Sequence, residues 1–243
     1  TCALPISSSI YGEPILLDKT TVVRARVDEP GLLPGGTSTK TYLIDTGSTL
    51  PVVSLSTAPP ILWDYESGIY TMGPGASSSN PYFGANFWLD WERPVHMELF
   101  ETDGSRAVSI DAGIKIHGGW PKAYAQKSVA IFARQQYGAS EIAYQMFPDK
   151  PIFEFESIVL RNSGNDWKYT LFRDGMIQDL ISGFNLDLQG YRPAIVFLNG
   201  EYWGIHNIRE KINEHYVASN YNIGTDDFHM MESLAVQRLA GEE

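Results

Sequence analysis

The chain has 243 residues and a formal net charge of −11, from 18 Lys and Arg against 29 Asp and Glu. A negative field of this size repels phosphate backbones, which argues against nucleic acid as a partner. No apolar run approaches the roughly 18 residues of a membrane span, and the length allows one large or two unequal domains.

The first residues, TCALPIS, resemble the translation of a common sequencing adapter, so residues 1–7 are predicted to be non-native. Their apolar run has no basic n-region in front of it, unlike a signal peptide. Cys2 is the single cysteine, which excludes an internal disulfide framework. Such cysteine poverty fits a cytosolic protein or an exported bacterial one.

Residues 8–46 contain three short β-branched or aliphatic runs, Pro14–Leu17, Thr21–Val27 and Thr39–Ile44, which predict strands. This segment resembles the C-terminal half of the immunoglobulin-like module found at the C-terminus of chitobiase and β-hexosaminidase. The resemblance implies a partial β-sandwich that lacks its opening strands, of a kind that accompanies secreted bacterial proteins.

The sequence Asp45-Thr-Gly-Ser48 follows two apolar residues, as in an aspartic protease, where two carboxylates share one proton. A single-chain enzyme of that kind needs a second Asp-Thr/Ser-Gly, and this sequence has none. Asp, Gly and Ser are also common turn residues. We therefore predict a turn that closes the preceding β module.

Three further runs predict strands, at Leu50–Leu55, Val95–Phe100 and Ala107–Ile116. Trp88 and Trp91 precede the second of them. Exposed indole rings can stack on sugars, so these tryptophans offer a glycan platform. Tryptophans clustered near strands more often belong to the core, and we favour that interpretation.

Gly118-Gly119 lies between the predicted strand Ala107–Ile116 and a second predicted strand in Gln126–Arg134, and Lys127 enters the second strand about eight residues later. Adjacent glycines let the backbone turn sharply and approach a ligand closely. A glycine turn followed by a lysine on the next strand is how protein kinases hold the phosphates of ATP. Two glycines alone are a weak signal, because most such pairs are plain turns.

The run Phe155–Asn162 predicts a strand, and the polar segment that follows it leads to a helix predicted at Trp167–Ser182. Asp166 is placed to cap this helix. Arg173, Asp174 and Asp179 lie off its apolar stripe.

At Tyr191–Arg209 two apolar runs flank Asn199-Gly200, the residues that a type I′ turn prefers, which predicts a β-hairpin followed by a helix. A weaker helical pattern runs from Met231 to Leu239. Four residues in and after the hairpin can ligate metals, but they lack the H-E-x-x-H spacing, and no metal site is predicted: His206, Glu210, Glu214 and His215.

Several of these stretches together resemble the CotH kinase family, named for a spore coat protein: WERPVHMELFETDG, DAGIKIHGGWPKAYAQKS, LRNSGNDW, LFRDGMIQDL and YRPAIVFLNGEYWGIHNIREK. The resemblance covers roughly residues 50–243. It implies an α+β fold, with the mainly antiparallel β N-lobe of an atypical protein kinase and one packed helix. The implied activity is transfer of phosphate from Mg-ATP to serine or threonine of secreted, surface or coat proteins.

Carried over by matching motif, Gly118 and Gly119 would form the phosphate loop, Lys127 would bind phosphate, and Glu210 would lie at the hinge beside the nucleotide. The acid that pairs with Lys127 stays open between Asp166 and Asp174. A set of polar residues in the same region is expected to form ion pairs or a structural motif: Arg161, Asn162, Asp166, Arg173 and Asp174.

The family's catalytic Asp/Asn segment and its metal-binding motif would lie beyond Glu243, so we expect no phosphoryl transfer from these 243 residues alone. The alternative is a non-catalytic surface module that binds glycan or anchors an assembly. Both hypotheses place the protein outside the bacterial cell or in its envelope.

Overall fold

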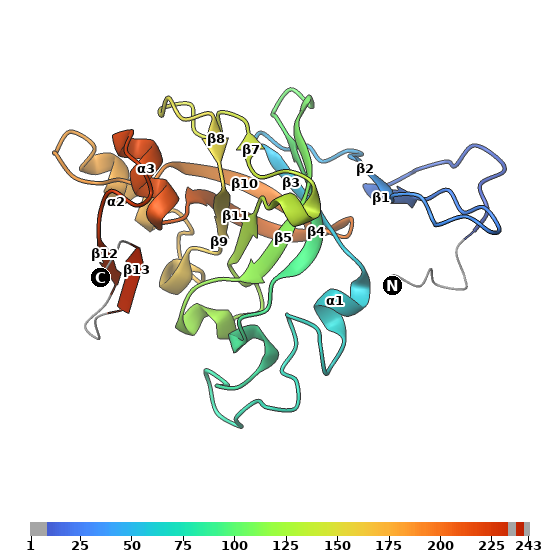
Figure 1. Cartoon of the computed structure of the whole chain (residues 1–243), viewed down its shortest axis with the longest axis horizontal. Helices are drawn as coiled ribbons and strands as arrows, with labels where there is room; N and C mark the ends of the chain where they lie inside the picture. Colours follow the sequence, from blue (N-terminus) through green and yellow to red (C-terminus); the bar gives the residue numbers. More distant parts are fainter. Residues whose placement is uncertain (1–8, 233–236, 241–243) are drawn as a thin grey trace.

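The computed structural model describes residues 9–232 and 237–240, and its centre is a closed barrel of seven strands (Figure 1). Around the barrel the strands follow one another in the order β10-β11-β9-β6-β5-β4-β3. Their bounds are β3 Val52–Ser56, β4 Arg93–Phe100, β5 Arg106–Ile116, β6 Val129–Phe132, β9 Ser157–Arg161, β10 Tyr191–Leu198 and β11 Glu201–Glu210.

All neighbouring barrel strands are antiparallel except β3 and β10, which pair in parallel and close the ring. The structure is consistent with the predicted α+β class and with mainly antiparallel strands, but these strands form a closed barrel in place of the expected kinase N-lobe. β3 bonds to β4 on one edge and to β10 on the other, which leaves it no free edge. The two strands of the closing pair are distant in sequence, so a strand pattern could not reveal this contact.

Alternate side chains of the strands fill the barrel. On β4 these are Val95, Met97 and Leu99, and on β3 they are Val53 and Leu55. The outer face of β3 is covered as well, because Val52 joins a second apolar cluster. Both faces of β3 are therefore buried, and even its serines, Ser54 and Ser56, are shielded from solvent.

The hairpin of β10 and β11 forms as the sequence predicts. Asn199 and Gly200 have φ of 53° and 86°, the positive values that a type I′ turn requires at both central positions. Thr57 N donates a hydrogen bond of 2.8 Å to Asn199 Oδ1, which ties the turn to the end of β3. The turn therefore fixes both the hairpin and its place in the barrel.

Residues 9–46 contain one two-stranded antiparallel sheet, β1 (Thr21–Ala25) with β2 (Ser38–Tyr42), which lies to one side of the barrel (Figure 1). The predicted partial sandwich is not present in this segment, and Pro14–Leu17 does not form a strand. β2 contacts the outer face of the barrel through Thr41, whose N–H donates to Glu98 Oε2 at 2.6 Å. The sheet is thus anchored to β4 rather than to further strands of its own.

The segment Asp45–Ser48 is a turn, as predicted. Asp45 and Gly47 take φ of 48° and 55°, and Ser48 Oγ accepts a hydrogen bond of 2.9 Å from Leu50 N. The turn leads the chain from β2 into β3.

Three short α-helices and four 3₁₀ turns connect the strands of the described chain. Their bounds are α1 Pro59–Trp63, α2 Arg173–Leu180, α3 Glu214–Tyr221, η1 Asn86–Trp88, η2 Trp120–Ala123, η3 Gln135–Tyr137 and η4 Gly164–Asp166. In Figure 1, α2 and α3 lie on the side of the barrel away from β1 and β2. None of the helices in the described ranges has the length and apolar character needed to span a membrane.

Helix α2 is shorter than the predicted Trp167–Ser182. Leu171 has φ of 65°, a left-handed conformation that an α-helix cannot contain, so the helix begins only at Arg173. Much of the predicted apolar stripe is exposed, including Met176 and Leu180. The helix instead approaches the barrel through Gly175, where a Cβ would lie 2.4 Å from the ring of Tyr191.

Two minor two-stranded sheets complete the fold: β7 (Ile142–Ala143) with β8 (Glu154–Phe155), and β12 (Met230–Glu232) with β13 (Gln237–Ala240). The helix expected from Met231 to Leu239 is wrong for the described part of that stretch, which forms strands, and residues 233–236 lie outside the described residues. The adapter-like residues 1–7 lie outside them too.

Candidate functional site

An open cavity of about 540 Å³ lies where the Gly118-Gly119 loop faces the turn that follows β9. Pockets for small ligands commonly measure about 300–1,000 Å³. Its lining combines glycines, amides, a hydroxyl, aromatic rings and one guanidinium, from Asn80, His117, Gly118, Gly119, Trp120, Pro121, Tyr124, Ser128, Arg161, Asn162, Gly164 and Asn165. The composition suits a polar ligand with a planar part.

Gly118 takes φ of 101°, a conformation that residues with a Cβ rarely adopt. A Cβ at either Gly118 or Gly119 would have no heavy atom within 4 Å. Crowding by neighbouring atoms therefore does not explain why these two positions are glycines. Gly118 allows the backbone conformation, and the free space beside both residues lets a ligand approach the backbone.

A hydrogen-bonded network centred on Asn162 forms one wall of the cavity. Ser128 Oγ donates to Asn162 Oδ1 at 2.8 Å, and Asn162 Nδ2 donates to the carbonyl oxygen of Gln126 at 2.6 Å. Gly164 N also donates to Asn162 Oδ1, at 3.0 Å. One buried amide thus ties the start of β6 to the turn after β9. The sequence pattern includes Asn162 in a polar motif but contains no sign of Ser128.

His117 in the cavity lining experiences a positive field from nearby side chains, although the chain is acidic and one of those side chains, Lys115, pairs with Asp90. The pKa of His117 is lowered from its ordinary value of 6.5 to about 4, first by burial and then by Lys211, Arg161, Lys122 and Lys115. These four cations come from separate elements and converge near one imidazole. An anion entering the cavity would meet this field.

Lys127 does not line the cavity. It is 4% exposed, and its ammonium donates hydrogen bonds to the carbonyl oxygens of Lys122 at 2.6 Å and Tyr124 at 2.9 Å. Its Nζ also lies 4.0 Å from the centroid of the Phe87 ring. Burial lowers the pKa of Lys127 to about 8. The structure therefore separates Lys127 from Gly118 and Gly119, with which the kinase pattern joins it.

Neither proposed acid pairs with Lys127. Asp166 Oδ2 accepts hydrogen bonds from Thr170 Oγ1 at 2.5 Å and Arg173 N at 3.2 Å, and Asp166 Oδ1 lies 3.1 Å from Arg173 Nη2. Asp166 therefore holds together the turn that leads into α2. Asp174, on α2, instead lies between two arginines, Arg161 on β9 and Arg209 on β11.

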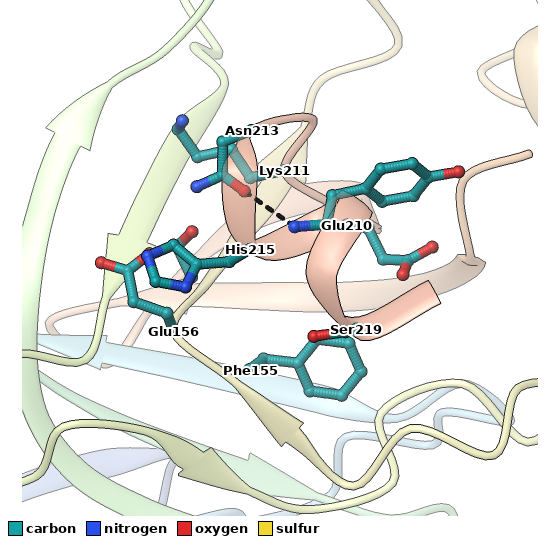
Figure 2. Close-up of a pocket in the computed structure, with 9 residues that line it drawn as sticks. Phe155, Glu156, Glu210, Lys211, Asn213, His215 and Ser219 are labelled. Atoms are coloured by element: carbon teal, nitrogen blue, oxygen red, sulfur yellow. Dashed lines mark hydrogen bonds between the residues drawn. The ribbon is translucent and has the colours of Figure 1, made fainter. Parts of the chain in front are cut away.

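Glu210 lies in a different place, beside a water-sized pocket of about 20 Å³ formed by residues 155–157 and 210–219 (Figure 2). Its Oε2 accepts hydrogen bonds from Lys150 Nζ at 2.5 Å and Gly190 N at 2.6 Å, and its Oε1 accepts one from Asn220 Nδ2 at 2.9 Å. The carboxylate is thus engaged on both oxygens, and the structure does not bring it to the Gly118-Gly119 cavity.

Of the four residues considered as metal ligands, Glu210 and His215 line the same small pocket, and His215 Nε2 lies 3.8 Å from Glu214 Oε1, whereas His206 lies apart from them. His206 is buried on β11, where its ring lies 3.1 Å from the carbonyl oxygen of Lys127, whereas His215 lines the small pocket on α3. Figure 2 shows His215 beside that pocket together with Asn213, whose Oδ1 accepts a hydrogen bond from Tyr216 N at the start of the helix.

Trp88 and Trp91 are partly buried against the core, as the core interpretation predicts. Trp88 Nε1 donates to the carbonyl oxygen of Pro81 at 2.8 Å, and the Arg93 guanidinium lies 4.7 Å from the Trp91 ring. The tryptophan that the cavity presents to solvent is Trp120, which is 63% exposed. Nothing in the sequence pattern distinguishes it from the other tryptophans.

A Ser-His-Asp cluster also lies on the outer face of β4 and β5. His96 Nδ1 is 2.7 Å from Asp111 Oδ1, and His96 Nε2 is 3.4 Å from Ser109 Oγ. Acyl transfer by such a triad also uses backbone N–H groups that stabilise an oxyanion. β4 pairs with β3 on one edge and with β5 on the other, so its ladder occupies those groups. We interpret the cluster as cross-strand surface packing.

Comparison with known families gives one match. Residues 114–237 match the family described as CotH kinase protein. The matched region holds the Gly118-Gly119 loop, β6, β9, α2 and the β10–β11 hairpin, while β3 and β4 of the same barrel precede it. A comparison with curated proteins finds no match. Because the matched region is just over half of the chain, the chain belongs to the CotH kinase protein family.

Proposed function

We propose that the Gly118-Gly119 cavity binds the phosphates of ATP, as part of a kinase-related domain that modifies serine or threonine of proteins outside the cell or in its envelope. The observation that carries the proposal is the meeting of this glycine loop with a cluster of cations in a chain of net charge −11. Family membership supports the choice of a nucleotide among anions.

The chemistry of the loop supports phosphate as the bound group. Phosphate oxygens are recognised by backbone N–H groups that a glycine turn leaves open, together with cationic side chains. Gly118 and Gly119 supply the open backbone, and Asn165 adds an amide group to the lining, while the Ser128 hydroxyl is engaged by Asn162. The tyrosine and tryptophan rings in the lining suit a planar base.

The lining does not suit the Mg²⁺ that accompanies ATP. Magnesium in such sites is held by one or two carboxylates in addition to phosphate oxygens. The residues that line the cavity include no Asp or Glu. The cavity therefore fits the nucleotide phosphates and not the metal, and we expect nucleotide binding without phosphoryl transfer from these 243 residues.

The test compares two glycines with similar backbones. Gly118 and Gly104 have φ of 101° and 82°, and a Cβ at either would have no heavy atom within 4 Å. Gly104 lies in the β4–β5 turn, away from the cavity lining. Alanine therefore strains both positions alike, but only Gly118→Ala alters the loop.

Binding of Mg-ATP to the 243-residue chain and both variants is measured by isothermal titration calorimetry. We expect Gly118→Ala to raise the Kd at least tenfold and Gly104→Ala to leave it within twofold. Equal affinities in all three proteins, or no binding by the parent, would contradict the proposal.

A second function is favoured by the exposure of Trp120 at the rim of the cavity, since exposed indole rings stack on sugars. In this alternative the chain is a non-catalytic module that retains glycan. Retention on insoluble polysaccharide that Trp120→Ala abolishes, with no change in melting temperature on adding Mg-ATP, would favour it over nucleotide binding.

A further inference from the structure

We infer that Arg161, and not Lys127, is the cation that contacts the anionic ligand in the cavity, and that Asp174 positions it. The ligand class is a phosphate or polyphosphate group. The inference rests on the proposed function for the identity of the nucleotide, but the anion subsite itself follows from the charges described below.

Arg161 is the last residue of β9 and the only Arg, Lys, Asp or Glu among the described residues that line the cavity. Its guanidinium lies against the turn after the strand, because a Cβ at Gly164 would be 3.1 Å from Arg161 Nη2. Arg161 Nε is buried and makes no hydrogen bond of good geometry in the described part of the chain, but it faces the carboxylate of Asp174 at 3.4 Å. The planar guanidinium fork can bind two phosphate oxygens at once.

Two guanidinium groups share a single carboxylate beside the cavity. Asp174 Oδ2 lies 3.4 Å from Arg161 Nε and 3.1 Å from Arg209 Nη1. Arg209 is 1% exposed, and it also donates a hydrogen bond to the neutral amide of Gln189 at 3.2 Å. The three side chains together carry one excess positive charge. An anion at Arg161 would neutralise it.

Helix α2 determines where Asp174 lies. Gly175 lets α2 approach the ring of Tyr191 so closely that a Cβ would lie 2.4 Å from it. This contact places the preceding residue, Asp174, between β9 and β11. Since Asp174 occupies the Nε side of Arg161, the Nη groups are left to the ligand.

Lys127 is unsuited to this role. Its ammonium donates to two carbonyl oxygens of the chain and packs on the Phe87 ring. These contacts direct the ammonium group away from the cavity. Lys127 instead ties residues 122–124 to the start of β6. A ligand would meet the loop that Lys127 holds, rather than Lys127 itself.

The test measures the Kd of Mg-ATP and of inorganic pyrophosphate by calorimetry for the 243-residue chain and its variants. Arg161→Gln removes the charge, and Arg161→Lys retains the charge without the fork. Arg134→Gln is the matched control, because Arg134 has a similarly exposed side chain, 44% against 39%, and pairs with Glu92 and Glu156 away from the lining.

We expect Arg161→Gln to weaken pyrophosphate binding at least tenfold, Arg161→Lys to weaken it less, and Arg134→Gln to leave it within twofold. Circular dichroism at the titration temperature identifies the folded variants, and Arg161→Lys decides the question if Arg161→Gln does not fold. Parent-like pyrophosphate binding by the folded Arg161 variant would overturn the inference.

The positioning role of Asp174 is tested by a double-mutant cycle. Asp174→Asn is expected to lower pyrophosphate affinity at least threefold in the parent and to have no further effect in Arg161→Gln. Losses that add in the double variant would mean that Asp174 acts on the fold and not through Arg161.

The outcomes separate this inference from the proposed function. If Gly118→Ala impairs ATP binding but Arg161→Gln does not, the nucleotide site stands and the role of Arg161 is wrong. If the parent binds pyrophosphate through Arg161 but does not bind ATP, the anion subsite stands and the nucleotide function is wrong. If the parent binds neither, both are wrong.

Discussion

The ammonium nitrogen of Lys127 lies 2.9 Å from the carbonyl oxygen of Tyr124, three residues earlier in the chain. A second hydrogen bond, to the carbonyl oxygen of Lys122, makes the side chain a brace across the segment that follows the glycine loop. The kinase pattern assigns this lysine to phosphate, but in the structure it holds the segment after the glycine loop in place.

Replacing this brace should loosen the loop. Lys127→Met keeps most of the apolar stem but leaves two carbonyl oxygens without their donor, which typically costs about 1–3 kcal/mol for each buried group left unsatisfied. We expect a lower free energy of unfolding and faster amide hydrogen exchange in residues 120–124. Lys19→Met, at an exposed position before β1, is the control and should change neither.

The same loop would remain protected in Lys127→Met if the lysine faced a ligand instead. Unchanged exchange in residues 120–124, combined with lost ATP binding, would therefore restore Lys127 as a phosphate ligand. This outcome would contradict the brace.

A second prediction concerns the buried arginine of the site. Asp174 forms an ion pair with Arg209, which is 1% exposed, so Asp174→Asn leaves a buried charge without this counter-ion. Removing one partner of a buried pair costs about 3–5 kcal/mol, and the partial exposure of Asp174 reduces the expected loss to about 2–3 kcal/mol. Urea unfolding of Asp174→Asn measures this loss. Asp179→Asn, an exposed position on the same helix, should stay within about 0.5 kcal/mol.

The parts of the fold that could be predicted from sequence are those fixed by local chemistry. Asn199 and Gly200 determine their hairpin because few other residues accept positive φ at both turn positions. Closure of the barrel depends on β3 meeting β10 in parallel, a contact between segments that neither alternation nor turn signals connect. The sequence pattern begins helix α2 too early because an apolar stripe does not reveal the left-handed backbone of Leu171.

The candidate site also has a part that could be predicted from the sequence and a part that could not. Gly118 and Gly119 could be singled out because a glycine pair between strands is visible in the sequence. The role of Arg161 could not, because it depends on the positions of Asp174 and Arg209 on two other elements. The kinase pattern points to the right segment, but a spacing of residues cannot tell whether a lysine faces a cavity or the chain's own carbonyl groups.

A third prediction follows from His117. Its pKa of about 4 reflects burial and the cations Lys211, Arg161, Lys122 and Lys115. A bound anion offsets those cations, so it should raise the pKa of His117 and favour proton uptake. ATP affinity should therefore increase as the pH falls from 7 toward 5.

Calorimetry of ATP binding at about pH 5.5 in two buffers of different ionisation enthalpy measures the proton uptake. His117→Gln should remove most of it while leaving the other residues of the cavity lining unchanged. Proton uptake of equal size in the variant would show that another group titrates on binding.

A fourth prediction concerns the metal. Because no carboxylate of the described residues lines the cavity, Mg²⁺ gains no protein ligand there, and ATP with its full negative charge should bind at least as well as Mg-ATP. Titration in EDTA measures this directly. A Kd that rises tenfold or more when magnesium is removed would require a metal ligand within the chain, and would contradict the lining.

The fifth prediction is acid destabilisation through His206, which is 1% exposed on β11. The carbonyl oxygen of Lys127 can only accept, so His206 Nε2 carries the proton, and its Nδ1 accepts from the Gln126 amide nitrogen at 3.1 Å. A second ring proton would point at that amide donor. Burial, together with this lack of an acceptor, agrees with a pKa of His206 lowered from 6.5 to about 4.

The direction in which the free energy of unfolding changes with pH follows from the number of protons that the folded and unfolded chains bind. Between pH 6.5 and 4 the unfolded chain protonates this histidine while the folded chain does not, so the free energy of unfolding falls as the pH decreases through that window. The loss should reach about 2.5 kcal/mol near pH 4.5, because a tenfold difference in proton affinity between the two states is worth about 1.4 kcal/mol. His206→Gln should flatten the decline, with the remainder due to His117 and, toward pH 4, to carboxyl groups such as Glu101 and Asp166 whose pKa is lowered in the folded state. His215→Gln, at a more exposed site, is the control, and an unchanged slope in His206→Gln would contradict the assignment.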